Sequence, residues 1–545
     1  MADEVTLPQT CQISSDQVVN DEGGFVWTVD DMVRVKRFLC LGSEGGTYYS
    51  SEQKLTEDNV QCIRRLIADG KGKDVVDVIC QFSLEGRTAK QTSILYALAV
   101  CVRRGDLDTK QHAYSVLGKI CRIPTHLFQF VEVCDKMGET TGWGRAHRKA
   151  VSAWYTSFAS DPIRLAMHVT KYRKRNDWAH RDLLRLAHTK PSDDAIGLIL
   201  RYVVKGIHKA KSMYCKNHDE DDDQSPFGKV LAFLEAVEEV RTSSDENRVM
   251  DLIKQHRLVR EHMPTELLGS VGLWRVLLEQ MPLTALIRNL GKMTSIGAIE
   301  AGNQQEGQVV KKLSDKTLLK AARIHPFNVL VAFKTYSSGK GDRGKLIWNP
   351  TKKIIAALDS AFYLSFKFVE PTNKRYLLAV DVSGSMGCSV LGTRIISCRE
   401  AAAAMMMVTK RTEEHSEVVA FSHKLTPLNV AQGHTLDAVV KTMCSLPFCA
   451  TDCSLPMVWA KRNNKKFDVF VVYTDSETYA GAVHPTEALR QYRKQSGVWD
   501  ARLIVCGMNS NGFTIADPDD PGMMDVVGFD SAAPETMRSF IMGDI

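Results

Sequence analysis

The spacing of the apolar residues changes near residue 370, and this change limits the possible folds more than any other feature of the chain. From about residue 50 to 360 the apolar residues recur at helical spacing, as in Val60, Ile63 and Ile67. After that point short apolar runs typical of buried strands follow: YLLAVDVS, SEVVAFSH, FDVFVVYTDS and ARLIVCG. The pattern predicts an N-terminal tail over residues 1–15, a helical domain over 16–370 and an α/β domain over 371–545.

The helical part consists of many amphipathic segments separated by short breaks such as ADGKGKD and SLEGRTAK. Consecutive helices with short turns favour antiparallel pairs that stack as an α-solenoid, in which each pair buries its apolar face on the next. No residue recurs at a fixed period, so the prediction depends on the helical spacing alone. One short run, RFLCL at 37–41, has the composition of a strand.

In the C-terminal part, the strand-like runs alternate with helix-like stretches at 394–411, 435–443, 453–461 and 485–495. Alternation of this kind predicts βαβ crossovers and a doubly wound parallel sheet that is covered on both faces.

Polar side chains follow the strand-like runs. Asp381, Ser383 and Ser385 come after the first run, Thr451 opens a helix, and Asp475 follows a later run. Because ligands of doubly wound sheets bind at the carboxyl ends of strands, we expect these side chains to lie on one rim. They offer five hard oxygen donors and neither sulfur nor imidazole, which suits Mg²⁺ completed by water or by a partner's carboxylate.

Other interpretations of this rim are weaker. A nucleophile elbow needs Gly-x-Ser-x-Gly and a phosphate loop needs Gly-Lys-Ser/Thr, and both are missing. A metal-dependent nuclease needs a general base and usually two bridged metals, whereas only two acids are present, so we expect no enzymatic activity. A serine-rich capped turn without a metal stays open. A zinc site would need a fourth ligand beside Cys444, Cys449 and Cys453.

The cellular location follows from the cysteines and from the hydropathy. Fourteen cysteines are scattered without a CxxC pair, which is typical of free thiols in a reducing compartment. The N-terminus has no apolar core of a signal peptide, and no apolar run approaches the roughly 18 residues of a membrane span. We therefore expect a cytoplasmic protein away from membranes, with nuclear import through KYRKR as an alternative.

The positive charge is concentrated in one window of the helical part. The whole chain carries a net charge of +6, and residues 371–545 hold 17 basic against 19 acidic residues. Residues 143–190 hold 11 basic against 3 acidic residues, with four histidines besides. Such a local excess favours RNA or another polyanion as partner, while a solvated basic helix face remains the alternative.

Within this window, residues 178–188 are predicted to be helical. Ala179, Leu183, Leu186 and Ala187 would then share the buried side, and the opposite side would carry Arg181, Arg185 and His188. Lys171 and Arg175 precede this helix in a linker that also carries Tyr172 and Trp178. Cations interleaved with aromatic rings suit phosphate contacts and base stacking.

The pattern Asp-x-Ser-x-Ser with a later Thr and Asp resembles the metal-ion-dependent adhesion site of von Willebrand factor A domains, over about residues 370–545. The resemblance implies that Ser383, Ser385 and Thr451 bind the cation directly, and that Asp381 and Asp475 bind it directly or through water. One departure is Ser476, which stands where the family often has glycine.

Three further segments, RFLCLGSEGGTYY (37–49), RLAHTKP and IHPFNVLVAFKTYSSGKGDRGKLIWNP (324–350), resemble the TROVE family of ribonucleoproteins together with the A-type domain. This resemblance implies a ring of HEAT-like helical pairs closed against the A-type domain. It also implies binding of small noncoding Y RNAs on the outer surface of the ring. Misfolded noncoding RNAs, such as defective 5S precursors, would place single-stranded ends in the central hole.

In the family, positions matching His188, Lys171 and Arg175 contact RNA, whereas Arg181 and Arg185 are added from helix geometry alone. The resulting hypothesis is a monomeric, non-enzymatic RNA-binding scaffold with a Mg²⁺ site for a protein partner. Its rival is a metal-dependent protein-interaction module for which RNA binding is incidental.

Overall fold

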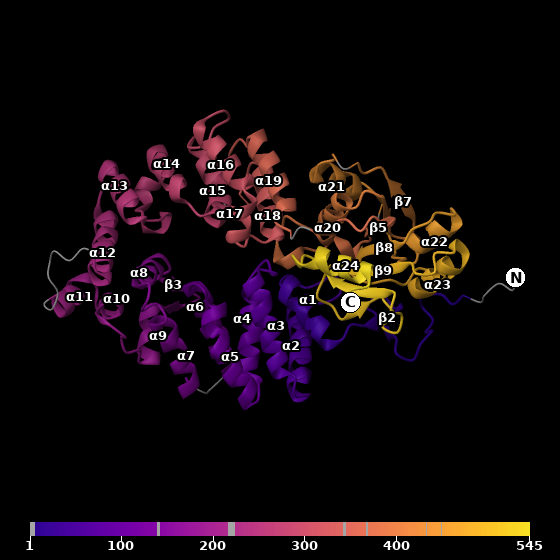
Figure 1. Ribbon diagram of the computed structural model, residues 1–545, viewed down its shortest axis with the longest axis horizontal. Coiled ribbons are helices and arrows are strands. Elements are labelled where there is room, and N and C mark those ends of the chain that lie inside the picture. Colours follow the sequence, from indigo (N-terminus) through magenta and orange to yellow (C-terminus); the bar gives the residue numbers. More distant parts are fainter. Residues whose placement is uncertain are drawn as a thin grey trace.

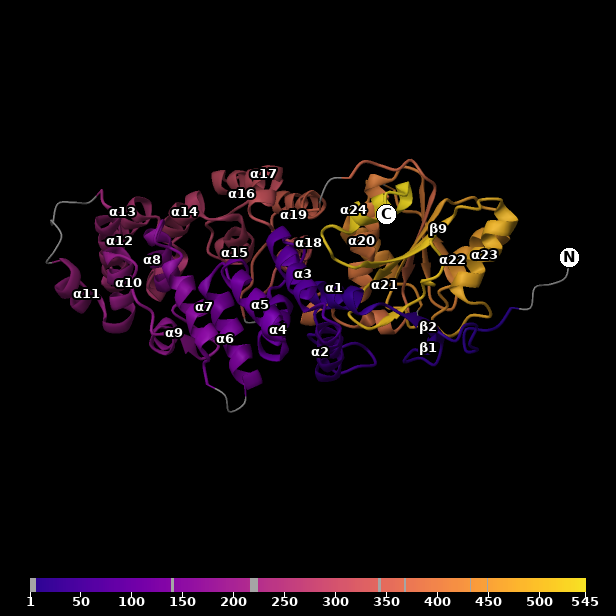
Figure 2. The same cartoon turned by 60° about the horizontal axis from the view of Figure 1, so that its bottom comes forward.

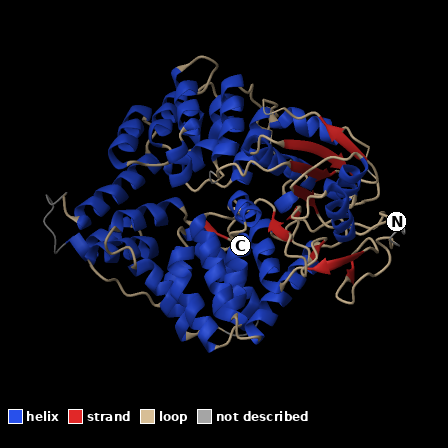
Figure 3. Cartoon of the chain, turned by 45° about the vertical axis from the view of Figure 1, so that its right-hand side comes forward, coloured by secondary structure: helices blue, strands red, loops and turns tan. Residues whose placement is uncertain are grey.

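The computed structural model describes residues 6–138, 142–215, 224–341, 345–366, 369–431, 433–447 and 449–545. Its helices follow one another along an arc that begins beside the C-terminal sheet domain and returns to it (Figure 1). Most strands gather at one end of the molecule, next to the N-terminus (Figure 3), whereas a short hairpin lies within the helical arc. Seen from below, the helical arc and the sheet domain lie side by side along the longest axis (Figure 2).

The helical region contains these described helices: α1 (Asp31–Leu41), α2 (Glu52–Ala68), α3 (Gly72–Glu85), α4 (Thr92–Arg104), α5 (Leu107–Ile120), α6 (Pro124–Gly138), α7 (Arg145–Thr156), α8 (Pro162–Lys171), α9 (His180–Ala187), α10 (Asp194–Lys205), α11 (Ile207–Tyr214), α12 (Pro226–Thr242), α13 (Glu246–His256), α14 (Val271–Gln280), α15 (Leu283–Ser295), α16 (Gln304–Ser314), α17 (Lys316–Ala321), α18 (Pro326–Ser337) and α19 (Lys352–Leu364).

Helices of the arc pack mainly on helices one and two places further along the chain. Helix α3 contacts α4 and α5, α4 contacts α5 and α6, and α5 contacts α7. This is the contact pattern of stacked antiparallel pairs, and it confirms the predicted solenoid. None of the described helices has the length and apolarity that crossing a membrane requires.

The strand-like run at residues 37–41 is helical, so that prediction was wrong. Asp30 caps helix α1 by accepting hydrogen bonds from the backbone amides of Met32 and Val33. The run is apolar on consecutive residues because the end of α1 is buried on every side, with Phe38, Leu39 and Leu41 all inside the core. A helix covered all round loses the 3.6-residue alternation by which it would be recognised.

The C-terminal domain has a six-stranded sheet of β5 (Tyr376–Asp381), β6 (Ser416–Phe421), β7 (Leu425–Leu428), β8 (Val469–Thr474), β9 (Arg502–Gly507) and β11 (Met523–Val527). Its order is β11-β9-β8-β5-β6-β7. All neighbours are parallel except β6 and β7, which form an antiparallel edge. Among the described residues of this domain, the sheet is accompanied by α20 (Cys398–Thr412), α21 (Leu436–Cys444), α22 (Leu455–Arg462), α23 (Pro485–Ser496) and α24 (Ala533–Met542).

Successive residues of β5 enter two different apolar cores. Leu378 and Val380 pack with residues of α20, α21 and α24, whereas Leu377 and Ala379 pack with residues of α22 and α23. Helices therefore cover both faces, as strand geometry requires of a parallel sheet with two buried faces. The predicted doubly wound α/β domain is confirmed.

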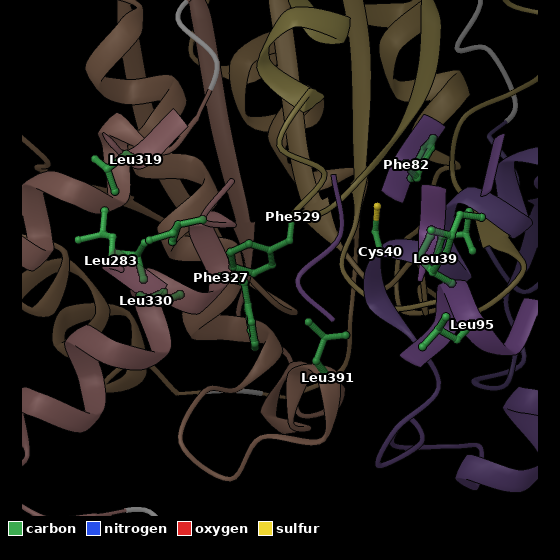
Figure 4. Packing of buried hydrophobic residues seen from close by; sticks show 14 of the residues in the cluster. Leu39, Cys40, Phe82, Leu95, Leu283, Leu319, Phe327, Leu330, Leu391 and Phe529 are labelled. Carbon is green, nitrogen blue, oxygen red and sulfur yellow. The ribbon is translucent and has the colours of Figure 1, made fainter. Parts of the chain in front are cut away.

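The core on one face of the sheet continues without interruption into the helical region. Phe327 of α18 and Phe529 of the C-terminal domain meet edge to face, with ring centroids 5.3 Å apart (Figure 4). A shared core of this kind gives the two regions a common interior.

The segment before α1 lies on the C-terminal domain. Strand β2 (Phe25–Thr28) pairs with β1 (Val18–Val19) on one side and with β10 (Phe513–Thr514) on the other. Upstream, the backbone amide of Gln9 donates a hydrogen bond to the carbonyl of Gly481. The described part of the predicted tail is thus packed on residues more than 400 positions away.

The beginning and the end of the helical region also meet. The turn between α3 and α4 accepts a hydrogen bond from Asn328 of α18 at the carbonyl of Ala89, over 3.0 Å. His325 lies 3.1 Å from the carbonyl of Arg87 through its Nε2. Burial lowers the pKa of His325 to about 4, and its Nδ1 accepts from the amide of Phe327, so a neutral ring donates through Nε2.

Candidate metal centre and basic surface

The five predicted metal ligands lie at the carboxyl ends of β5 and β8 and in the loop before α22. Strands β5 and β8 are parallel neighbours with Val380 opposite Tyr473, so the two strands end side by side. All five side chains are buried, with exposed fractions between 0% and 5%: Asp381, Ser383, Ser385, Thr451 and Asp475.

Direct interactions connect four of these side chains. The hydroxyls of Ser383 and Ser385 lie 3.2 Å apart, and Ser385 hydrogen-bonds with the carboxyl of Asp475. The carboxyl of Asp381 accepts from the amide of Ser383 at 2.8 Å and from the hydroxyl of Thr474 at 2.7 Å. Thr451 is tied to the loop that follows β8, because its carbonyl accepts from the amides of Tyr479 and Ala480.

Two carboxyls share this buried rim. Burial raises the pKa of Asp381, and burial together with the charge of Asp381 raises the pKa of Asp475 to about 7. The guanidinium of Arg399 lies beneath, where it donates to the carbonyls of Val382 and Ser383 at 2.9 and 3.0 Å. Two buried acids with three hydroxyls form a donor set that fits Mg²⁺, because the cation would offset the repulsion between the acids.

The serine that replaces the expected glycine keeps the conformation of a glycine. Ser476 has φ +64°, in the left-handed region that glycine enters without steric cost. Its carbonyl accepts from Asn20 over 3.4 Å, and Asn20 also donates to the carbonyl of Thr478 over 2.9 Å. The loop after β8 is therefore held in place by the N-terminal segment, which explains how it tolerates a side chain at this position.

Two residues beside the rim carry no motif and were missed. Glu477 has a pKa raised to about 9 by burial and by the charges of Asp475 and Asp21. The amide of Asn511 donates to the carbonyl of Asp475 at 2.8 Å and to Glu477 at 3.2 Å. Neither stands at a spacing that the motif sets, so only the folded chain places them here.

Part of the rim faces the helical region. A small cavity of about 20 Å³ separates Ser385 and Cys388 from the segment that follows α1, including Ser43 and Tyr48. Lys90 reaches from the α3–α4 turn to the carbonyl of Leu391, 2.5 Å away. Any protein partner of the metal centre would have to approach from another side.

The carboxyls of the rim predict an unusual pH dependence. In the folded state Asp475 holds a proton up to about pH 7, whereas the unfolded chain releases it near its ordinary pKa of 3.8. In metal-free buffer the free energy of unfolding should therefore fall as the pH rises from about 4 to 7, and Mg²⁺ should restore it. The measurement is the melting temperature at pH 5 and pH 8, with chelator and with Mg²⁺.

Asp475→Asn serves as the control, since asparagine cannot titrate and shares the shape of aspartate. The difference in melting temperature between wild type and variant should change with pH and with Mg²⁺. A constant difference across all four conditions would contradict a titrating metal centre.

The basic window has a different local structure from the predicted one. Residues 174–179 form a hairpin of β3 (Lys174–Arg175) and β4 (Trp178–Ala179), and α9 begins only at His180. Asn176 and Asp177 have φ of 51° and 61°, as a two-residue hairpin turn requires. Asparagine and aspartate tolerate this region better than most residues, and they formed a turn signal in the segment that the sequence analysis treated as a linker.

Helix α9 turns a different face to the core than expected. His180, Leu183, Leu184 and Ala187 are buried, whereas Leu186 is 40% exposed. The helix also ends at Ala187, and His188 caps it with φ 52°. Leu186 was thus placed wrongly, because the packing of α9 on its neighbours turns the face with Leu183, Leu184 and Ala187 to the core, and helical spacing alone did not distinguish this face from the one with Leu186.

The exposed side chains of Arg175, Arg181, Arg185 and His188 form what we call the α9 surface. Arg181 and Arg185 are one turn apart on the same side of α9. Within the described parts of the chain, the three arginine side chains of this surface have neither an ion pair nor a hydrogen bond. Their charge is consequently available to a polyanion.

Lys171 does not share this surface. Its side chain is 19% exposed, lies 4.0 Å from Glu261 and faces the ring of Tyr172 at 5.1 Å. It lines a cavity of about 750 Å³, the α13 cavity, together with Lys254, Arg257 and Arg260 and with apolar residues of α14 and α15. Arg181 lines another cavity of about 420 Å³, with Arg173 and Arg241.

Four cations of these two cavities lie outside the basic window and were missed: Arg241, Lys254, Arg257 and Arg260. They come from α12 and from the segment around the end of α13, more than 50 residues after the window. A count of charge along the chain cannot find them, because folding alone brings them beside Lys171 and Arg181.

The cysteines give no support to a zinc site. Cys444 and Cys449 are exposed and Cys453 is buried, and all fourteen cysteines are free thiols. Among the residues that the structure describes, no three His, Cys, Asp or Glu side chains are placed to hold a metal ion.

Known protein families match both the helical region and the C-terminal domain. The family model of the TROVE domain matches residues 18–335, and that of the Ro60 vWA domain matches residues 375–541. A Caenorhabditis elegans protein named RNA-binding protein RO60 is 38% identical over 98% of this chain and 91% of its own length. A protein of the same name from Deinococcus radiodurans is 36% identical over 99% and 98%.

A solved structure has the same architecture. The crystal structure of the Deinococcus radiodurans RO (RSR) protein superposes with a TM-score of 0.68 at 35% identity. The match covers 94% of this chain and all of the other.

Proposed function

This chain belongs to the TROVE-domain family of Ro60 proteins, and from this premise we propose that it binds small noncoding Y RNAs and misfolded noncoding RNAs, such as aberrant 5S rRNA precursors, in RNA quality control. It is an RNA-binding ribonucleoprotein component, and the particular RNAs are the proposed part. The helical pairs and the C-terminal domain would form a closed ring around the hole that receives single-stranded RNA ends.

One observation carries the proposal: the α9 surface holds arginines without neutralising partners among the described residues. Some exposed arginines elsewhere, such as Arg65, Arg248 and Arg375, lie against an acid within 2.6 Å, whereas the α9 surface brings three arginines without such a partner close together. Unpaired guanidinium groups attract phosphates and release the condensed counterions of RNA, which is the main source of affinity for a nucleic acid backbone. Arg175, Arg181, Arg185 and His188 would therefore contact the backbone of a structured RNA.

The α13 cavity supports the second class of RNA ligand. Its volume of about 750 Å³ and its apolar walls leave room for an unpaired nucleotide, and Lys171, Lys254 and Arg257 stand at its edge. Proteins bind single strands with cations along the phosphate backbone, and they bury the bases against side chains away from water. We therefore assign Lys171 to a single-stranded RNA end instead of to the α9 surface.

The metal centre would hold one Mg²⁺ through Ser383, Ser385 and Thr451, with Asp381 and Asp475 acting directly or through water. A bound cation supplies a Lewis-acidic position that can take a carboxylate from a protein partner. Because the described rim offers no separate general base, we propose that the protein is not an enzyme. We place the protein in the cytoplasm as a monomer, with nuclear import through KYRKR as the alternative.

The rival function is a metal-dependent protein-interaction module with incidental RNA binding. Ser383→Ala combined with Ser385→Ala separates the two, because it removes donors from the metal centre and leaves the α9 surface intact. We expect the variant to lose its stabilisation by Mg²⁺ and to bind a structured small RNA within about twofold of wild type. The measurements are thermal denaturation with Mg²⁺ and filter binding of a labelled RNA at several salt concentrations.

The outcomes are clear in both directions. Wild-type protein that does not bind small RNAs, or whose affinity does not change with salt, would overturn the RNA proposal. A variant that loses RNA binding while it remains folded would favour the rival. Shortening of the RNA in the presence of Mg²⁺ would point to a nuclease.

A further inference from the structure

A third basic cavity lies where the two ends of the helical region meet the C-terminal domain. Its volume is about 420 Å³, and we call it the junction cavity. Four segments line it: the end of α3, the helix α17 with its following turn, the end of α19, and the turn before α24. The lining residues used below are Glu85, Lys316, Lys320, Arg323, Phe366 and Ser531.

The charge of the junction cavity is unbalanced. Among the lining residues, Lys320 and Arg323 stand against one acid, Glu85, which lies 3.8 Å from Arg87. Lys320 and Arg323 are exposed and form no ion pair with any residue in the described ranges. The excess of positive charge also affects Arg122, because burial and the charge of Arg323 together lower the pKa of Arg122.

The backbone of α17 and of the turn after it places these cations along the junction cavity. Lys316 and Lys320 are four residues apart and thus share a side of α17. Arg323 follows with φ 48° and lies against Gly86, where a Cβ would approach the Cβ of Arg323 to 3.4 Å. That distance is an ordinary contact, so the end of α3 and the turn after α17 touch although they are more than 230 residues apart, and Gly86 is favoured by its own φ of +69°.

The remaining walls suit a phosphate carried on a larger body. Leu319, Ile324 and Phe366 are buried and form apolar walls. Ser531 adds a hydroxyl from the turn before α24, whereas the hydroxyl of Ser365 already donates to the carbonyl of Phe362 at 2.6 Å. Several cations, hydroxyl donors and an apolar wall are the combination by which proteins bind phosphorylated ligands.

We propose that the junction cavity binds a phosphate-bearing ligand, either the terminal phosphate of an RNA strand or a free oligophosphate, and that the ligand links α17 to the end of α3 and to the C-terminal domain. The ligand would supply the negative charge that the cavity lacks at the contact between the first and last helices. The site is separate from the α9 surface and from the metal centre, so it goes beyond the function proposed above.

Tripolyphosphate is the first probe, used in metal-free buffer so that it cannot act by removing a cation from the metal centre. We expect a saturable rise in melting temperature and slower hydrogen exchange in α17 and around Gly86 of the wild-type protein. The variant Lys320→Glu with Arg323→Glu should bind tripolyphosphate at least tenfold more weakly. Both side chains are exposed, so the variant should fold.

Lys311→Glu with Lys352→Glu is the matched control, because it changes the charge equally at exposed positions of α16 and α19 outside the cavity. It should bind the probe as wild type does. No saturable effect on wild type, equal binding by the two variants, or protection that avoids α17 would each overturn the proposal.

A pair of short RNA strands, with and without a 5′-phosphate, distinguishes the two sources of the ligand. Tighter binding of the phosphorylated strand by wild type, with the preference lost in Lys320→Glu with Arg323→Glu, assigns the cavity to an RNA end. If wild type binds both strands equally and still binds tripolyphosphate, the cavity is assigned to a free oligophosphate.

Discussion

Arg37→Ala is expected to lower the free energy of unfolding by about 3–5 kcal/mol, the usual cost of leaving a buried charge without its partner. The side chain is 1% exposed and pairs with Asp525 of β11. Its Nη1 also donates to the carbonyls of Asn511 and Phe513 at 3.1 and 2.8 Å. The substitution would leave one carboxylate and two carbonyls unsatisfied between α1 and the sheet domain. Urea denaturation followed by tryptophan fluorescence measures the loss.

Arg65→Ala is the matched control for this experiment. Arg65 forms the same kind of bidentate ion pair with Asp31, but its side chain is 56% exposed. Exposed pairs contribute at most about 1 kcal/mol, so the control should change stability little. Arg37→Ala combined with Asp525→Ala should recover part of the loss, because no unpaired charge remains. Equal effects of Arg37→Ala and Arg65→Ala would show that the buried pair does not hold the two regions together.

Replacing Arg175, Arg181 and Arg185 together by glutamine should weaken the binding of a structured small RNA at least tenfold and reduce its salt dependence. Three phosphate contacts correspond to a change of about two to three in the slope of log affinity against log salt. Between 50 and 200 mM salt the wild type should therefore lose roughly 40-fold more affinity than the variant. Filter binding across this range gives both quantities.

A control with the same net charge separates local contacts from the general field of the protein. Arg65, Arg248 and Arg375 are exposed, and each already pairs with an acid. Their replacement by glutamine removes three charges whose fields are largely cancelled, so RNA affinity should change by less than about twofold. A similar loss in both triple variants would mean that net charge, and not the α9 surface, governs the affinity.

Much of the sheet domain could be predicted from local pattern. Strands β5, β6, β8 and β9 are runs of buried apolar residues, and each coincides with its prediction within a few positions. The remaining strands were missed for a physical reason. Strands β7 and β10 are short, and residues of β7 such as Thr426 and Pro427 are exposed at a sheet edge. An edge strand needs little apolar surface, so its composition does not distinguish it from a loop.

Site residues could be predicted where they are close to one another in the sequence. Asp381, Ser383 and Ser385 follow one strand, so their spacing alone places them on the rim. The separation of Lys171 from Arg181 was not predictable in this way. The hairpin turn at Asn176 and Asp177 reverses the chain between them, and a turn of two residues leaves no trace in a count of charges.

The sequence by itself determined the helical character of the first region and the central strands of the sheet, which oxygen donors stand at the strand ends, and where positive charge accumulates along the chain. These properties depend on residues within one or two turns of each other. Only the tertiary structure decided that Arg37 pairs with Asp525, that Glu477 and Asn511 adjoin the predicted metal ligands, and that Lys320 and Arg323 line a junction cavity with Glu85. Such contacts join residues tens to hundreds of positions apart, and no local spacing encodes them because they arise from the way in which whole elements bury their apolar faces on one another.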